Sequence, residues 1–162
     1  MTIANSKIAI TSGTIEKLAT TGFGDPCKII NLGPGDLFVG SLNVDQSGGT
    51  SAFTNGIATV VGTGTNYTSW VEVGDRVRAN DSADWGKVLT VDSDIQLTLT
   101  AGYTGIDHTG QLKSVNGPLS GFKVNVSPIV GSELPLSEYA GEVWGYADGG
   151  NCDVRVVENI AG

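Results

Sequence analysis

The segment from Gly56 to Val115 constrains the fold most, because it has the pattern of a complete small β module inside a longer β chain. Short apolar runs alternate with polar residues and are interrupted by Gly, Asn and Asp, as in half-buried strands joined by tight turns. The segment Tyr67–Val73 is compatible with a short helical turn or with a strand that carries Trp70. Five strands are predicted, at Ile57–Gly62, Arg76–Asn80, Gly86–Val91, Ile95–Thr100 and Gln111–Val115.

The sequence on either side of this module predicts a second β domain, to which both flanks contribute. Gly33-Pro34-Gly35-Asp36 has the composition of a four-residue turn and predicts a hairpin between Cys27–Leu32 and Leu37–Leu42. No segment has an apolar period of 3.6 residues, so the predicted class is all-β. We expect a jelly-roll-like β-sandwich from residues 1–50 and 116–162, with a small β-barrel or sandwich module inserted at 51–115. The other predicted flank strands are Lys7–Thr11, Thr14–Ala19, Gly121–Val126, Val143–Ala147 and Cys152–Val157.

Charge and hydropathy exclude several classes of partner. The net charge of −8 opposes binding to the phosphates of nucleic acid and to an anionic membrane surface. No apolar run approaches the roughly 20 residues that cross a bilayer. The N-terminal segment lacks the continuous apolar stretch of a signal peptide, so export by that route is not expected. The sequence therefore predicts no nucleic acid and no membrane among the partners.

The two cysteines, Cys27 and Cys152, lie one in each flank. Neither belongs to a closely spaced pair of the kind that binds metals. We predict two reduced, partly buried thiols that pack as small apolar groups. A disulfide between the flanks remains the alternative.

No motif predicts a catalytic, metal or cofactor site. His108 is the only histidine and has no nucleophile motif beside it, and Gly62–Asn66 lacks the Lys-Ser/Thr end of a phosphate-binding loop. The aspartates between residues 81 and 94 lack EF-hand spacing, and Asp is common in tight turns for conformational reasons. Two carboxylate pairs, Glu138/Glu142 and Asp92/Asp94, are not bracketed by a cleft pattern. We therefore predict a protein that is not an enzyme and that has no cofactor.

Three tryptophans admit two interpretations. Trp70, Trp85 and Trp144 have the flat rings that a sugar-stacking platform needs. Small β-sandwiches also need large side chains to fill their cores and contacts. We favour the core or a subunit contact.

Several short motifs resemble those of tailed-bacteriophage virion structural proteins. In the flanks they are Asn31-Leu32-Gly33, Val39-Gly40, Pro135-Leu136 with Gly141-Glu142, Ala147-Asp148-Gly149 and Asp153-Val154-Arg155-Val156. The segments VVGTGTNYTSWVEVGDRVRAN and LTVDSDIQLTLTAGYTG are similar to a small β module of phage head and tail proteins. These motifs are architectural and bring no catalytic residues with them.

The resemblance implies a capsid decoration (cement) protein, assembled in the host cytoplasm and placed on the outer capsid surface of the virion. Its partners would be the major capsid protein, whose subunits it bridges, and two further copies of itself in a homotrimer. Candidate interface residues are an N-terminal arm that adds to a neighbouring subunit's sheet, with Trp144 and Tyr146. The arm comprises Thr2, Ile3, Ala4, Asn5 and Ser6. The alternatives are a tail, baseplate or fibre-attachment protein and a carbohydrate-binding adhesion module.

Overall fold

The computed structural model describes residues 2–21, 27–80, 82–115, 122–124, 133–135 and 141–160. Within these residues the chain is all-β, as predicted, and every pair of named strands is antiparallel. A single 3-10 turn, η1 (Tyr67–Ser69), is the one helical element of the described chain. The described residues include no helix long and apolar enough to cross a bilayer.

The chain divides into two compact units, which we call the sandwich unit and the barrel unit. The sandwich unit is formed by Met1–Ser41 with Gly121–Gly162, and the barrel unit is Leu42–Ser120. The barrel unit thus begins before residue 51 and ends after residue 115, the predicted limits. It begins early because strand β4 (Asp36–Val44) continues past Ser41, and its last three residues pair with β11 (Leu112–Val115).

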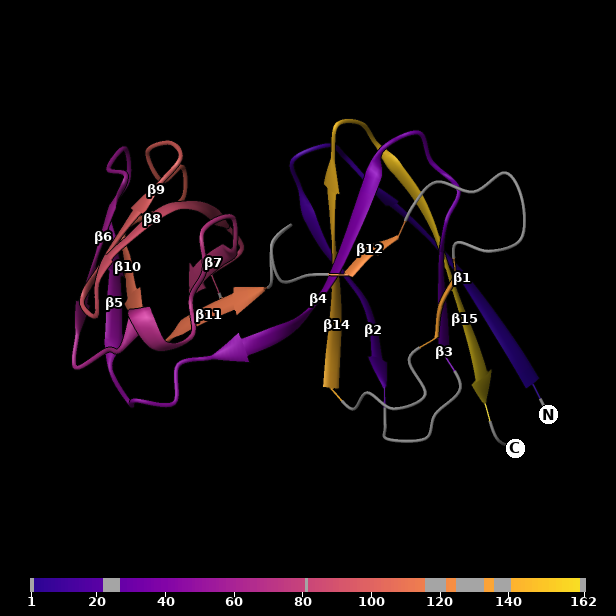
Figure 1. Cartoon of the computed structure of the whole chain (residues 1–162), viewed down its shortest axis with the longest axis horizontal. Helices are drawn as coiled ribbons and strands as arrows, with labels where there is room; N and C mark the ends of the chain where they lie inside the picture. Colours follow the sequence, from indigo (N-terminus) through magenta and orange to yellow (C-terminus); the bar gives the residue numbers. More distant parts are fainter. Residues whose placement is uncertain are drawn as a thin grey trace. The chain divides into compact units, whose positions relative to one another are not determined.

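The sandwich unit contains two sheets whose strand order is that of a jelly roll (Figure 1). Consecutive strands alternate between the sheets, so β1 and β2 are in different sheets, as are β3 and β4, β12 and β13, and β14 and β15. The predicted jelly-roll-like sandwich is therefore confirmed. One sheet has the order β1 (Thr2–Ile10), β15 (Cys152–Ile160), β3 (Cys27–Asn31) and β13 (Glu133–Pro135). The other has the order β2 (Ile15–Thr21), β14 (Gly141–Asp148), β4 and β12 (Phe122–Val124).

The predicted hairpin between Cys27–Leu32 and Leu37–Leu42 is wrong. Strand β3 pairs with β15 and β13, whereas β4 pairs with β14, β12 and β11, so the turn at Gly33–Asp36 joins the two sheets. The turn packs against the β14–β15 connection instead of closing a ladder. A Cβ atom on Gly35 would lie 2.1 Å from the backbone oxygen of Gly150, so only glycine permits this approach.

Three sheet-to-sheet connections are hydrogen-bonded to each other at one end of the sandwich unit. The β1–β2 turn bonds to β14 through Gly13 N and Ala147 O at 2.8 Å, and to the β14–β15 turn through Ser12 N and Asn151 Oδ1 at 2.9 Å. The β3–β4 turn bonds to the same β14–β15 region through Gly35 N and Asn151 O. We call this end the corner.

The core of the sandwich unit lies between the inward faces of its two sheets. Alternation places Cys27, Ile29 and Asn31 of β3 inward, with Lys28 exposed between them. The buried apolar cluster is formed by Ile10, Leu18, Ala19, Cys27, Ile29, Leu37, Val39, Val124, Val143, Ala147, Cys152, Val154 and Val156.

Both cysteines are free and buried in this core. In the register of β15, Cys27 lies opposite Glu158, six residues along the strand from Cys152. Six residues of strand span about 20 Å, far beyond the reach of a disulfide. The prediction of two buried thiols is confirmed, and the alternative bridge is excluded by the register.

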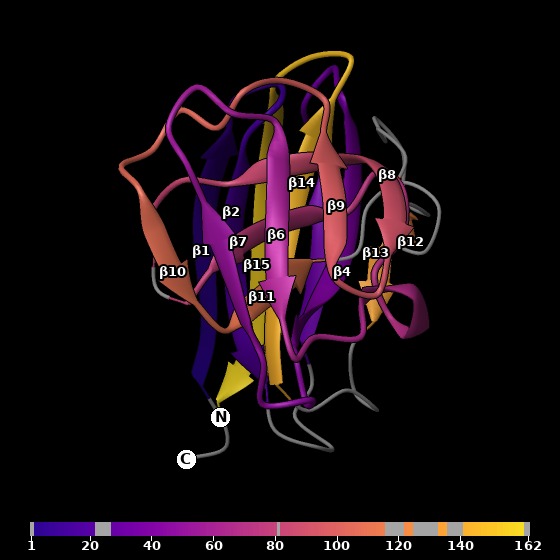
Figure 2. The same cartoon turned by 90° about the vertical axis from the view of Figure 1, so that its left-hand side faces the viewer.

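The barrel unit is a sheet that closes on itself (Figures 1 and 2). Its strand order begins with β10 and ends with β11, which are two halves of one segment interrupted only at Gln111. The two ends of the sheet are therefore joined by the chain itself, and the small barrel predicted for the insertion is present. Its strands are β10 (His108–Gly110), β5 (Thr50–Phe53), β6 (Thr59–Thr63), β9 (Gln96–Leu99), β8 (Gly86–Ser93), β7 (Arg76–Ala79) and β11.

Five barrel strands correspond to the five predicted ones, while β5 and β10 were not predicted. The segment after Asn66 forms the helical turn η1, the first of its two predicted alternatives. Tyr67, the first residue of this turn, has no solvent-exposed surface. The barrel core consists of Phe53, Val60, Tyr67, Val71, Val77, Ala79, Val88, Leu97, Leu99, Tyr103 and Leu112.

Candidate functional site

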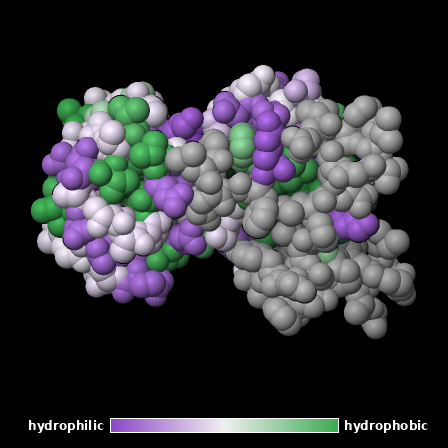
Figure 3. All heavy atoms as spheres, in the orientation of Figure 1, coloured by the Kyte–Doolittle hydropathy of each residue, from purple (hydrophilic) through white to green (hydrophobic). Residues whose placement is uncertain are grey.

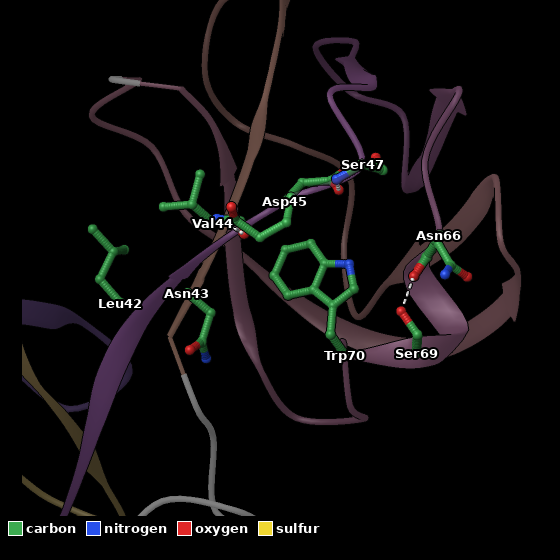
Figure 4. A pocket seen from close by; sticks show the side chains of 9 residues that line it. Leu42, Asn43, Val44, Asp45, Ser47, Asn66, Ser69 and Trp70 are labelled. Atoms are coloured by element: carbon green, nitrogen blue, oxygen red, sulfur yellow. Dashed lines mark hydrogen bonds between the residues drawn. The ribbon is translucent and has the colours of Figure 1, made fainter.

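A hollow of about 640 Å³ in the barrel unit is the candidate functional site. It is lined by residues 42–47, which run from the end of β4 into the following loop, and by three residues at η1, Asn66, Ser69 and Trp70. The indole of Trp70 lies between these two lining segments (Figure 4). Most of the polar groups in the lining are amides and hydroxyls, and its one charged side chain is Asp45.

Asp45 is held rigidly although it lies in a loop. Its backbone N–H donates to Leu112 O, its backbone oxygen accepts from Gln111 Nε2 at 2.6 Å, and its Oδ1 accepts from Ser47 N at 2.8 Å. The residue is only 1% exposed, and the second carboxylate oxygen, Oδ2, is buried without a hydrogen-bond partner. A buried polar atom without a hydrogen-bond partner lowers the stability of the fold by about 1–3 kcal/mol. Asp45 Oδ2 is therefore a buried acceptor whose hydrogen-bonding capacity the protein does not use.

Trp70 supplies the complementary group. Its backbone N–H donates to Tyr67 O at 3.2 Å and caps the C-terminal end of η1. The indole nitrogen Nε1, which is only a donor, is buried and has no hydrogen-bond partner. The same hollow is thus lined by one residue with an unused acceptor and one with an unused donor.

The hydroxyl of Tyr67 lies in a buried polar cluster behind this region. It is 2.5 Å from Ser51 Oγ. Burial is the largest effect and raises the pKa of this hydroxyl, while hydrogen bonds with Ser51 and Thr65 lower it less, and the charge of Asp45 raises it by the smallest amount. Tyr67 is therefore neutral at physiological pH and contributes no second negative charge near Asp45.

The acidic loops are occupied by hydrogen bonds within the protein. Asp92 accepts from Thr98 Oγ1 at 2.7 Å and from Thr90 Oγ1 at 2.8 Å, and these bonds lower the pKa of its carboxyl. Asp94 accepts from the Thr68 hydroxyl. Among the described residues no three His, Cys, Asp or Glu side chains gather to hold a metal, and Asp81 lies outside those residues.

The three tryptophans do not form one platform. Trp85 stacks with Arg78, whose guanidinium carbon is 4.5 Å from the ring centroid, and Trp144 belongs to the sandwich unit. Only Trp70 lines the hollow.

The candidate interface residues Trp144 and Tyr146 lie on β14 and are nearly covered. Their exposed fractions are 9% and 3%, respectively. Trp144 Nε1 donates to Glu142 Oε2, and the Tyr146 ring stacks on Phe38 with the centroids 6.3 Å apart. The chain itself covers the two rings and leaves little of their surface for a partner, and their assignment to an interface stays a prediction.

The predicted arm, Thr2–Ser6, is part of β1 and pairs with β15 of the same chain, from Thr2 opposite Ile160 to Ser6 opposite Val156. This segment is therefore not a free arm, because its pairing with β15 runs on without interruption from the pairing of the rest of β1. Among the described residues, strand β1 is nevertheless the last in its sheet order, so there the edge of β1 facing away from β15 belongs to the rim of the sheet.

The other residues that the sequence analysis weighed as catalytic candidates do not come together in one site. His108 lies on β10 opposite Phe53, and Glu142 forms an ion pair with Lys17 at 2.6 Å. Glu138 lies outside the described residues, so the pair Glu138/Glu142, which the sequence did not favour as a catalytic dyad, is not tested by the structure. Asp45 does not stand out in the sequence, because Asn43–Thr50 has only the composition of a polar link. The one available signal was an Asp before Gln-Ser-Gly-Gly, which is typical of a side chain that bonds its own turn.

Exposed large apolar side chains are concentrated on the barrel unit, where hydrophobic and hydrophilic residues are interspersed (Figure 3). They come from several strands and loops, and single exposed apolar residues are normal on soluble proteins. Six of the seven in the described chain are in this unit: Ile57, Val61, Val73, Leu89, Ile95 and Ile106.

Comparisons with known proteins do not place the chain in a family. No family model, no curated protein and no solved structure matches it.

Proposed function

We propose that this protein is a non-enzymatic structural component of a tailed-phage virion, a capsid decoration protein that binds the outer surface of the head. The observation that carries this proposal is that three of the phage-like motifs meet at the corner of a jelly-roll sandwich: Asn31-Leu32-Gly33, Ala147-Asp148-Gly149 and Asp153-Val154-Arg155-Val156. Jelly rolls are a common architecture of viral capsid domains, and also of lectins and cupins.

The motif residues support an architectural role, because their polar groups are used for folding. Asn31 is fully buried, donates from Nδ2 to Gly35 O and Val124 O, and accepts from Gly33 N. Leu32 N donates to Asp153 O at 2.7 Å, which joins the Asn-Leu-Gly motif to the Asp-Val-Arg-Val motif.

The rim position of β1 supports the proposed self-association. A strand at the rim of a sheet offers backbone N–H and C=O groups that another chain can extend. In the proposed homotrimer this edge contacts a neighbouring copy, and the sandwich unit binds the major capsid protein. The contact with the neighbouring copy is thus made by the rim strand of a formed sheet, in place of the free N-terminal arm predicted from the sequence.

Light scattering across a dilution series tests the oligomer first. We expect a mass three times that of the chain, unchanged on dilution. Immunogold electron microscopy of particles then tests the location, because a head protein labels the capsid surface, while a tail or baseplate protein labels the tail. A stable monomer that also fails to sediment with empty capsids contradicts the proposal.

A further inference from the structure

We propose that the hollow of the barrel unit is a binding site for a neutral carbohydrate. The proposed site is independent of the virion role, because all of its lining residues belong to the barrel unit. In this hollow a buried hydrogen-bond acceptor and a buried donor are both without partners.

The unpaired groups indicate the chemistry of the ligand. Asp45 Oδ2 only accepts hydrogen bonds and Trp70 Nε1 only donates them. A hydroxyl group both donates and accepts, so a ligand with adjacent hydroxyls satisfies both groups at once. Both side chains line the hollow, so a ligand seated there lies against the two residues that carry these atoms.

The rest of the lining excludes other ligand classes. The described lining residues include no Lys, Arg or His, so among them an anion meets only the negative charge of Asp45. Asp45 is the single carboxylate among the described lining residues, and in the described part of the chain no three His, Cys, Asp or Glu side chains gather to hold a metal. The amide and hydroxyl side chains, among them Asn43, Asn66 and Ser69, are poor partners for an apolar ligand.

The Trp70 ring gives the hollow an apolar surface beside these polar groups (Figure 4). A large aromatic ring with a polar tip suits a ligand that has an apolar face and a polar rim. A pyranose has this distribution, with C–H groups on its faces and hydroxyls at its edge. The geometry therefore favours a sugar over a small, uniformly polar molecule.

The test is an NMR titration of the full chain, observing the indole N–H resonances, with four neutral oligosaccharides: maltotriose, cellotriose, chitotriose and mannotriose. We expect at least one of them to shift the Trp70 resonance in a saturable manner, with the Trp144 resonance unchanged. Asp45→Asn removes the acceptor with little change of shape, and Trp70→Phe removes the donor but keeps an aromatic ring. Each variant is expected to weaken binding about tenfold, the effect of losing one hydrogen bond to a buried group.

Trp85→Phe is the matched control, since Trp85 stacks on Arg78 and does not line the hollow. Binding by Trp70→Phe is followed through backbone amides of residues 43–47, and the dispersion of each spectrum shows whether the variant is folded. The inference is overturned if no sugar shifts the Trp70 resonance at about 10 mM, well above a millimolar dissociation constant, because the hollow then holds only water. Binding that survives both hollow variants overturns it equally, because the site then lies elsewhere.

Discussion

Asn31 is the residue on which the corner of the sandwich unit depends. Its amide makes three hydrogen bonds in a site with no exposed surface, and all three partners are backbone groups. An amide can satisfy two carbonyls and one N–H at once, which no apolar side chain of similar size does.

Asn31→Ala is expected to lower the free energy of unfolding of the sandwich unit by about 3 kcal/mol, because it leaves buried backbone groups without partners. Urea denaturation followed by the amide resonances of β15 measures this. Asn66→Ala is the control, since Asn66 is exposed and its side chain makes no capping bond to η1. Equal stability of the two variants contradicts the structural role of Asn31.

Asp92 offers a second test at the residue scale. Hydrogen bonds from Thr98 first, and then from Thr90, lower the pKa of its carboxyl. A lowered pKa in the folded state means that the ionised form is favoured by folding. The resulting stabilisation is present above the unfolded-state pKa and is lost as pH falls through the folded-state pKa.

Thr98→Val removes the stronger donor without changing the shape of the strand and is expected to raise the pKa of Asp92 towards its ordinary value. Carboxyl-carbon NMR against pH measures the change. Thr63→Val, on the neighbouring strand β6, is the control and leaves the Asp92 titration unchanged. An unaltered pKa in Thr98→Val contradicts the hydrogen-bond explanation.

Among the elements, the turn between β3 and β4 decides whether the two sheets are connected correctly. Gly35→Ala puts a methyl group 2.1 Å from the backbone oxygen of Gly150 and is expected to destabilise the sandwich unit by about 3 kcal/mol, as severe overpacking does. Gly13→Ala is the control, because Gly13 has a φ of 83° in open space and its replacement costs only about 1 kcal/mol. Urea unfolding compares them, and a Gly35→Ala protein as stable as the control contradicts the close approach at the corner.

The strands themselves were largely predictable, because alternation and turn residues are local signals. Strands β7, β8, β9 and β11 follow the predicted segments closely, since Val and Leu alternate there with polar residues. Strand β10, His108–Gly110, has no such pattern, and it exists because the barrel closes through its pairing with β5. Which strands pair with each other was harder to predict. The wrongly predicted hairpin of β3 and β4 shows why, because the same turn composition suits a hairpin within one sheet and a connection between two sheets.

The candidate site was predictable only in part. An aromatic residue at position 70 was recognised as a possible contact for sugars, but the hollow needs two segments, residues 42–47 and 66–70, that are separated by 18 residues of sequence. Asp45 becomes notable only when its burial is known, because an aspartate in a polar link is ordinarily solvated. Unpaired buried atoms are a property of packing and leave no local sequence pattern.

At the scale of the whole molecule, the two units should fold independently. Each has its own buried apolar cluster, and the hydrogen-bonded strand pairs of each lie within that unit. Replacing residues 42–120 with a short Gly-Ser linker is expected to leave a folded sandwich unit, and the excised segment is expected to form the barrel alone.

Two-dimensional amide spectra of the two pieces measure this, and each should overlay on its part of the full-chain spectrum away from the new ends. The full chain, recorded under the same conditions, is the reference. A collapsed, poorly dispersed spectrum of either piece contradicts independent folding.

The pairing of Leu42 with Val115 has a consequence for the order of events during synthesis. These residues are direct neighbours across the β4–β11 ladder, so a folded barrel holds the two flanks of the chain within about 5 Å of each other. Strand β1 has its partner in β15, on the far side of the insertion, and it must wait until that partner has been translated. The barrel is complete by then, and its adjoining ends remove most of the entropy cost of closing so long a loop. The folded barrel unit thereby keeps the two halves of the sandwich unit close together, so that they can pair once both have been translated.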